Sequence, residues 1–146
     1  MSLANTFENE LLLHIFQNAD IANIGDAGGL QNSASAGSLY VGLHTSDPGE
    51  AGDQTTNETS YTNYARQAVA RSAAGWAVTN NVADNVAAVT FPACGATGAT
   101  ISHVSVGTAG SGAGKILWSG ALTANLVVSA GVTPAFAIGA LDISVD

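Results

Sequence analysis

Ionic side chains are scarce in this chain of 146 residues: only 10% are charged, against roughly 25% in an average soluble domain. Between residues 85 and 141 the single formal charge is Lys115. Surface charge keeps isolated domains apart, so a segment this neutral predicts a protein that lies against neighbouring chains. The segment is not a disordered tail either, because 47% of the chain is hydrophobic.

Basic residues are nearly absent, since Arg66, Arg71 and Lys115 face 11 acidic residues and the net charge is -8. Proteins that bind nucleic acids neutralise phosphates with Lys and Arg. The sequence therefore excludes direct nucleic-acid binding, and the same argument disfavours anionic membrane surfaces.

Cysteine occurs once, at Cys94, so an intrachain disulfide scaffold is excluded. No apolar run approaches the roughly 18–20 residues that a transmembrane helix needs. Glu8 and Glu10 stand where a signal peptide would be apolar. We expect a protein that is made in a cytoplasm and stays soluble or joins an assembly.

Residues 3–17 have the pattern of an amphipathic helix, with Leu3, Phe7, Leu11 and Ile15 at every fourth position and Leu12 and Phe16 widening the stripe. Asn5 with Glu8 resembles a capping box, although Ser2 is an equally good cap. A helix this short is marginal alone and must dock on something. Residues 20–37 are rich in Gly, Asn and Ser, which predicts an extended arm.

The remainder is divided at short intervals by turn residues, as an all-β fold requires. The predicted strands are 38–44, 64–72, 76–79, 86–91, 100–107, 115–122, 125–129, 132–138 and 141–145. We therefore predict an antiparallel β-sandwich or jelly roll of about eight strands with one N-terminal amphipathic helix. Residues 1–37 would be the helix and arm, and residues 38–146 the β-sandwich of one globular domain.

No catalytic constellation stands out. His44, Ser46 and Asp47 are the residue types of a hydrolytic triad, but triads are assembled by folding and rarely by sequence neighbours. Asp47-Pro48-Gly49 is better explained as a turn. A hydrolase that uses His44 and an acid remains the enzymatic alternative, and we predict no enzyme.

Metal and cofactor sites are not predicted either. Asp47, Glu50 and Asp53 lack the register of a calcium loop, and His14, His44 and His103 lack zinc spacing. Cys94 has no adjacent base to activate it. The glycine-rich run 107–114 matches no phosphate loop and predicts a flexible hairpin connection.

A partner interface is predicted at six residues that combine apolar area with directional hydrogen bonds. They are Phe7, Leu11, His14, Tyr61, Tyr64 and Arg66. For Tyr61, Tyr64 and Arg66 the alternative is a strand end whose aromatic rings cover the rim of the sandwich.

The order of several sequence blocks resembles a family of small structural proteins of tailed bacteriophages. The blocks are the helical start 5–16, followed by 39–48, 64–69, 88–92, 101–106, 116–122 and 138–143. The resemblance covers most of the chain apart from the arm at 20–37, and it supplies no catalytic residues. Members are labelled tail-fibre or minor tail proteins, or look like head decoration (cement) proteins that bind as dimers or trimers.

The resemblance leads to two structural hypotheses. The first is a decoration protein on the capsid surface of the virion, a homo-oligomer that binds the major capsid protein and stabilises the shell. The second is a tail component, a fibre, tip or adaptor, with receptor or glycan contacts through its polar loops. A stand-alone carbohydrate-binding sandwich is disfavoured, because Trp76 and Trp118 fit core or rim positions. Copy number per virion separates head from tail, because decoration needs hundreds of copies.

Overall fold

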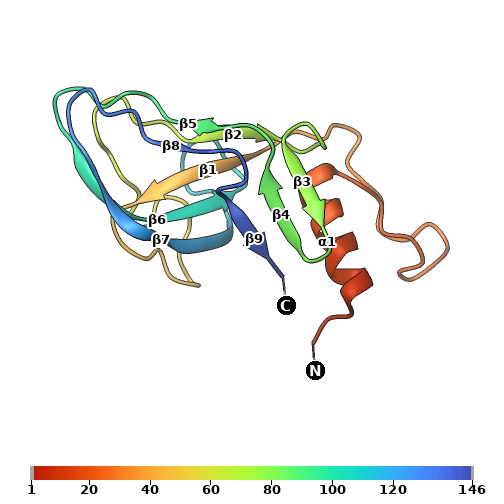
Figure 1. The fold of residues 1–146 in the computed structure, drawn as a ribbon. Coiled ribbons are helices and arrows are strands. Elements are labelled where there is room, and N and C mark those ends of the chain that lie inside the picture. Colours follow the sequence, from red (N-terminus) through yellow and green to blue (C-terminus); the bar gives the residue numbers. More distant parts are fainter. Residues whose placement is uncertain (1, 146) are drawn as a thin grey trace. The chain divides into compact units, whose positions relative to one another are not determined.

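A computed structural model of the chain describes residues 2–145. Within these residues it has one helix and nine strands (Figure 1). The elements are α1 (Asn5–Gln17), β1 (Ser38–His44), β2 (Gln67–Ala70), β3 (Trp76–Thr79), β4 (Val82–Asn85), β5 (Val89–Thr90), β6 (Ala99–Gly107), β7 (Ile116–Val128), β8 (Ala135–Phe136) and β9 (Asp142–Ser144).

The strands form three antiparallel sheets. Their strand orders are β2-β1-β6-β7, β3-β4-β9 and β5-β8. The prediction of a mostly β protein with one short N-terminal helix is confirmed. The jelly-roll topology and the count of about eight strands are not confirmed.

Two compact units make up the chain. Unit 1 contains Met1–Ser38, Val69–Ala88 and Phe136–Asp146, and unit 2 contains Leu39–Ala68 and Val89–Ala135. The chain therefore passes between the units several times. The predicted boundary between an arm at 1–37 and a domain at 38–146 stays a prediction.

The helix of unit 1 packs on the sheet β3-β4-β9 (Figure 1). Its buried side chains are Glu8, Leu12 and Phe16, one helical turn apart on a single face. The Phe16 ring meets Trp76 of β3 edge-on, with the ring centroids 4.8 Å apart. Burying Leu12 and Phe16 contributes roughly 1.5–3 kcal/mol each, which offsets the marginal stability of a short helix.

The C-terminal end of α1 is held by an arginine. The helix ends at Gln17, and the following C-cap residue, Asn18, adopts the left-handed conformation that closes many helices. The Arg71 guanidinium donates hydrogen bonds to the carbonyl oxygens of His14 (2.8 Å), Ile15 (2.6 Å) and Ala36 (3.0 Å). A cation at this end also suits the negative pole of the helix dipole.

In unit 2, β1 and β6 pair antiparallel from Tyr40 opposite Gly107 to His44 opposite His103. Alternate residues of the two strands, Val41, Leu43 and Val106, form part of the core with Ile101. This pair is the base on which the long loop after β1 is built.

Strand β7 forms the outer edge of the four-stranded sheet. It pairs with β6, but the register shifts between Ile101 and His103, because Leu126 lies opposite Ile101 and Ala121 lies opposite His103. The residues between them form a bulge in one long, largely exposed strand. The two strands predicted at 115–122 and 125–129 are therefore one element.

Some local predictions are wrong in detail. Strand β4 was not predicted, and the structure places it between β3 and β9. No side chain caps α1, whose N-cap is Ala4 instead of Asn5 or Ser2. The buried stripe of the helix runs through Leu12 and Phe16, whereas Phe7 and Leu11 are only half-buried.

Candidate functional site

The candidate functional site is the long polar connection between β1 and β2, residues 45–66, which we call the clamped loop. It lies entirely in unit 2. Backbone hydrogen bonds fold it back on β1, from Thr45 to the Asn57 carbonyl (2.9 Å) and from Thr59 to the Leu43 carbonyl (2.9 Å). The loop is therefore an ordered extension of the sheet.

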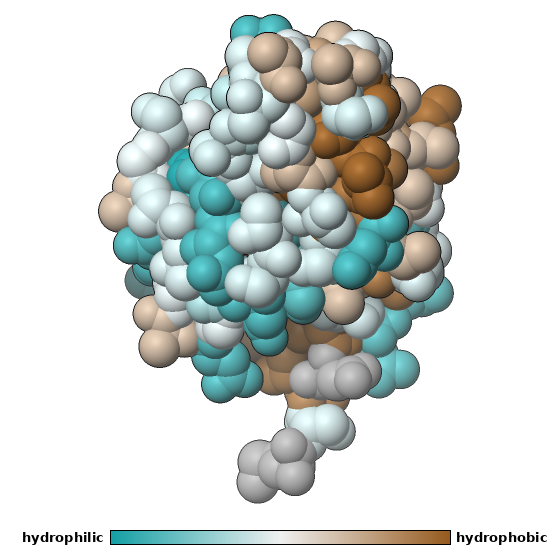
Figure 2. Space-filling view, turned by 90° about the vertical axis from the view of Figure 1, so that its left-hand side faces the viewer, coloured by the Kyte–Doolittle hydropathy of each residue, from teal (hydrophilic) through white to brown (hydrophobic). Residues whose placement is uncertain are grey.

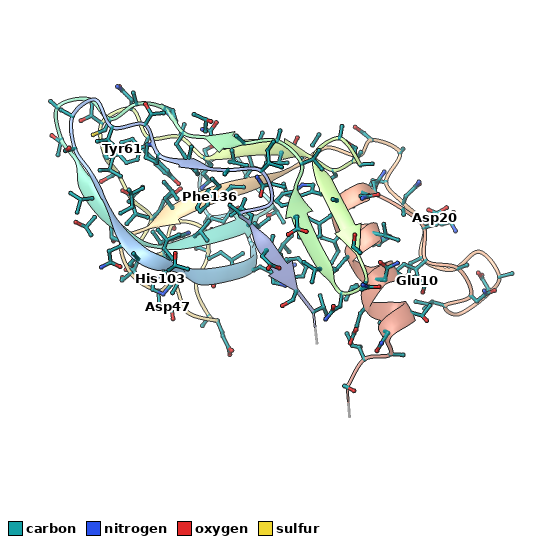
Figure 3. The ribbon with its side chains drawn as sticks, viewed as in Figure 1. Glu10, Asp20, Asp47, Tyr61, His103 and Phe136 are labelled. Carbon is teal, nitrogen blue, oxygen red and sulfur yellow. The ribbon has the colours of Figure 1, made fainter. Side chains whose placement is uncertain are left out.

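The first turn of the clamped loop is the predicted Asp-Pro-Gly turn. The Gly49 amide donates to the Asp47 carboxylate (2.8 Å), and Gly49 has a φ of 70°. Figure 3 shows Asp47 on the outside of the ribbon. The turn interpretation of this segment is confirmed.

An ion pair holds the end of the loop to its middle. The Arg66 guanidinium donates to both Glu58 carboxylate oxygens, with Nε at 2.6 Å and Nη2 at 2.7 Å. The Tyr64 hydroxyl donates to Glu58 (3.0 Å) and accepts from the Leu43 amide (3.0 Å). Bidentate geometry makes this the strongest kind of side-chain pair, and the Arg66 side chain is only 2% exposed.

This environment perturbs the pKa values of the cluster. The Glu58 carboxylate raises the pKa of Arg66 above its ordinary value. Burial raises the pKa of Tyr64, and burial likewise raises the pKa of Tyr61. At neutral pH the arginine is thus a cation and both tyrosines are neutral hydrogen-bond donors.

The structure brings together the three predicted interface residues of unit 2. The Tyr61 and Tyr64 rings meet edge-on with centroids 5.4 Å apart, and Tyr64 shares Glu58 with Arg66. Tyr61 is buried and donates to the Pro92 carbonyl (2.9 Å) (Figure 3). These side chains support the loop from inside, and a partner contact at them stays a prediction.

The other three predicted interface residues, Phe7, Leu11 and His14, lie on α1 in unit 1 and are half-buried. The His14 ring nitrogen Nδ1 lies 2.6 Å from the Ala19 carbonyl oxygen, so His14 helps to close the end of the helix. Their role toward a partner also stays a prediction.

Sequence reasoning missed Gln54, which links the clamped loop to the glycine-rich run 107–114. Buried Gln54 accepts from the Ala109 amide (2.8 Å), and Arg66 donates to the Ala109 carbonyl (2.9 Å). A Cβ on Gly114 would lie 2.1 Å from the Gln54 Oε1 atom. The glycine run thus packs closely around the Gln54 side chain. No signal in the sequence predicted this contact, because Gln54 is one polar residue among many in a polar loop.

His44 and Ser105 form a buried pair beneath the loop. The His44 Nδ1 lies 2.9 Å from the Thr56 carbonyl, which only accepts, so this nitrogen carries the hydrogen and Nε2 accepts from the Ser105 hydroxyl at 2.8 Å. Burial lowers the pKa of His44. Both residues are at most 1% exposed, so the pair offers a substrate no access.

The outer side of the clamped loop presents hydrogen-bonding groups on this rigid base. Its exposed polar residues are Thr45, Ser46, Asp47, Glu50, Thr55, Asn57, Ser60, Thr62 and Asn63. Among residues 2–145 no group of three or more His, Cys, Asp or Glu side chains is placed to hold a metal ion. The arrangement is suited to recognition by hydrogen bonds.

A family model described as "Podophage GP4 fiber I protein gp80" matches residues 2–144. The chain belongs to this family. The predicted resemblance to structural proteins of tailed phages is thereby confirmed, and the family suggests a virion location. A search of curated proteins finds no match.

The family match bears on the two structural hypotheses, capsid decoration and tail component. The description names a fibre, so a structural role in a tailed-phage virion is supported, and the capsid-decoration hypothesis is not. In the described part of the chain, no helix is long and apolar enough to cross a membrane.

Proposed function

We propose that the chain is a non-enzymatic fibre component of a tailed-phage virion that takes part in attachment to the host. The observation that carries this proposal is the fibre-family match, which extends over nearly the whole chain, residues 2–144. The buried state of the His44–Ser105 pair supports the non-enzymatic part of the proposal.

The clamped loop supports the attachment part. A recognition surface must hold its polar groups in fixed positions, because ordering a flexible loop on binding costs free energy. The Glu58–Arg66 pair and Gln54 hold the loop in one conformation from below. Its exposed hydroxyl, amide and carboxylate groups are then available to a receptor at the cell surface.

We further propose that copies of the chain associate with one another through the edge of β7. Residues 116–128 carry no charge, and β7 is an edge strand whose Val127 side chain is 67% exposed. Edge strands usually carry charge or proline to prevent pairing. A second copy of this chain is the occupant that fits, because an edge without charge can approach its own copy antiparallel without repulsion.

Apolar exposure is not confined to β7. Among residues 2–145, the large apolar residues that are at least 36% exposed are Ile24, Leu30, Val86, Leu126, Val127 and Ile138. Brown patches interrupt the polar surface on the face drawn in Figure 2. Contiguous apolar patches are typical of surfaces that pack against neighbours, whereas single exposed apolar residues are normal, so the uncharged edge of β7 carries the assembly part of the proposal.

The location is tested by labelling virions with gold-conjugated antibodies against the purified protein and counting copies per particle. We expect label at the tail and a copy number far below that of capsid subunits. Label spread over the head in hundreds of copies would overturn the fibre proposal.

A further inference from the structure

Unit 1 has a polar hollow at the start of α1. Its volume is ≈ 770 Å³, which falls within the roughly 300–1,000 Å³ of ligand sites. It is lined by the first residues of α1, including Asn5, Glu8 and Asn9, and by Asn80 and Asn81 of the turn between β3 and β4. Carboxamides and one carboxylate therefore dominate its wall.

Glu8 is the unusual member of this wall. It is 8% exposed and lies on the inward face of α1, in line with Leu12 and Phe16. Within residues 2–145 its carboxylate has no hydrogen-bond or ion-pair partner. Although most of the side chain is buried, the carboxylate oxygens are not enclosed, so they are open to the hollow, where a ligand that donates hydrogen bonds would meet an unpaired acceptor.

Hydrogen-bond donors lie beside this acceptor. No side chain caps α1, and the first bond of the helix runs from the Glu8 amide to the Ala4 carbonyl. The amide groups of Asn5, Thr6 and Phe7 therefore have no acceptor inside the helix. The side-chain amides of Asn80 and Asn9 add further donors and acceptors to the wall.

Charge decides which ligand fits. An anion would suit the helix N-terminus but would be repelled by Glu8 and by the net charge of -8. A cation would meet a single carboxylate and the positive end of the helix dipole. A neutral ligand whose adjacent groups both donate and accept meets neither penalty, and the vicinal hydroxyls of a sugar have this property.

We propose that this hollow is a saccharide subsite in which the Glu8 carboxylate accepts hydrogen bonds from vicinal hydroxyls and the uncapped start of α1 donates to a third oxygen. The inference deepens the proposed function, on which its biological use rests, by naming a ligand class for attachment. It is independent of the clamped loop, which lies in the other unit.

The test is a titration of the isotope-labelled full chain, followed by amide chemical shifts. The probes are glucose, galactose and N-acetylglucosamine to about 50 mM, far above the millimolar dissociation constants of weak binders, with inorganic phosphate and calcium chloride as charged probes. We expect at least one sugar to shift the amides of residues 5–9 and 80–81, and neither salt to do so.

Variants separate binding from folding. Glu8→Gln keeps the shape and should weaken sugar binding about tenfold, the effect of losing a charge-assisted hydrogen bond. Glu8→Leu extends the apolar stripe of α1, so it should fold and should not bind. Glu10→Gln removes the same charge from the same helix (Figure 3) and should bind like the wild type.

Three results would overturn the inference: no sugar shifts these amides, a salt shifts them in place of the sugars, or Glu8→Gln binds as tightly as Glu10→Gln. These results leave the fibre proposal intact, because that proposal depends on where the antibody labels the virion. Conversely, head labelling together with Glu8-dependent sugar binding would keep the subsite and remove the fibre assignment.

Discussion

Single charged residues in unit 2 act mainly through what they hold in place. Arg66 was predicted as an interface residue, yet its guanidinium is saturated by Glu58 and the Ala109 carbonyl. A buried ion pair is weak evidence of net stability, but removing one partner leaves an uncompensated charge. Arg66, one of the three Lys and Arg residues in the chain, is therefore used for internal hydrogen bonding.

We predict that Glu58→Ala lowers the free energy of unfolding by about 3 kcal/mol, because Arg66 loses its partner while it remains buried. The measurement is urea denaturation of the purified protein. The double variant Glu58→Leu with Arg66→Met is the matched control and should recover much of the loss. A cost below about 1 kcal/mol for the single variant, typical of an exposed pair, would show that water solvates Arg66.

His44 makes stability depend on pH. Burial lowers its pKa in the folded chain, whereas the unfolded chain has the ordinary value of about 6.5. As the pH falls through 6.5, the unfolded chain takes up the proton first, so the contribution of neutral His44 to stability is complete above this pH and is lost below it.

We therefore predict that the free energy of unfolding decreases between pH 7.5 and 5.5, and that His44→Gln reduces this slope. His103→Gln, on the paired strand, removes a neighbour that contributes least to the lowered pKa of His44, so it should reduce the slope by less than His44→Gln does. The ring protons of His44 followed by NMR give an independent readout. A titration midpoint at or above 6.5 would contradict the prediction.

At the scale of elements, the small sheet of unit 1 contains an unfavourable pair. Asp84 of β4 lies directly opposite Asp142 of β9, and like charges in this position destabilise a sheet. Burial and the charge of Asp142 raise the pKa of Asp84. The sheet is therefore relieved of repulsion as the pH falls and Asp84 takes up a proton.

We predict that Asp142→Asn stabilises the protein by about 0.5 kcal/mol at pH 7, the order of a cross-strand pair. Thermal unfolding measures the gain, which should shrink as the pH falls through the pKa of Asp84. Glu10→Gln changes the net charge equally at a distant position in the sequence and is the control. An equal gain in both variants would point to net charge alone and refute the pairwise explanation.

The sequence predicted correctly those strands whose formation depends on their own residue pattern. Ser38–His44 and Trp76–Thr79 were predicted with the bounds that β1 and β3 have. Strand β4 ends in Asp84 and Asn85, residues that disfavour strands, and it forms because β3 and β9 pair with it on both sides. The bulge that joins both parts of β7 contains Asn125, a residue type common in turns, so the local pattern indicated a break between two strands where pairing with β6 continues the strand.

The candidate site was predictable in part for the same reason. The Asp47–Gly49 turn depends on neighbours in sequence and was predicted. The seat of Gln54 depends on Ala109 and Gly114, far along the chain. Glu8 looked like a capping residue by its spacing from Asn5, whereas packing turned it to the buried face with Leu12. The positions of Gln54 and Glu8 depend on tertiary contacts, which cannot be inferred from a single sequence.

At the scale of the whole molecule, the shortage of charge noted first in the sequence corresponds to exposed apolar strand surface. We predict that the purified protein self-associates and that Val127→Lys on β7 shifts it toward monomers, because a charge must then be desolvated at the strand edge. Thr55→Lys, in the exposed part of the clamped loop, adds the same charge and should leave association unchanged.

Sedimentation equilibrium over a range of concentrations gives the association constant of each variant. We expect Val127→Lys to weaken association at least tenfold, the effect of about 1.4 kcal/mol. A wild type that is monomeric at every concentration would contradict the assembly proposal. If the wild type, Val127→Lys and Thr55→Lys all have the same association constant, the interface does not include β7. The next position to substitute would then be Ile138, which is 71% exposed.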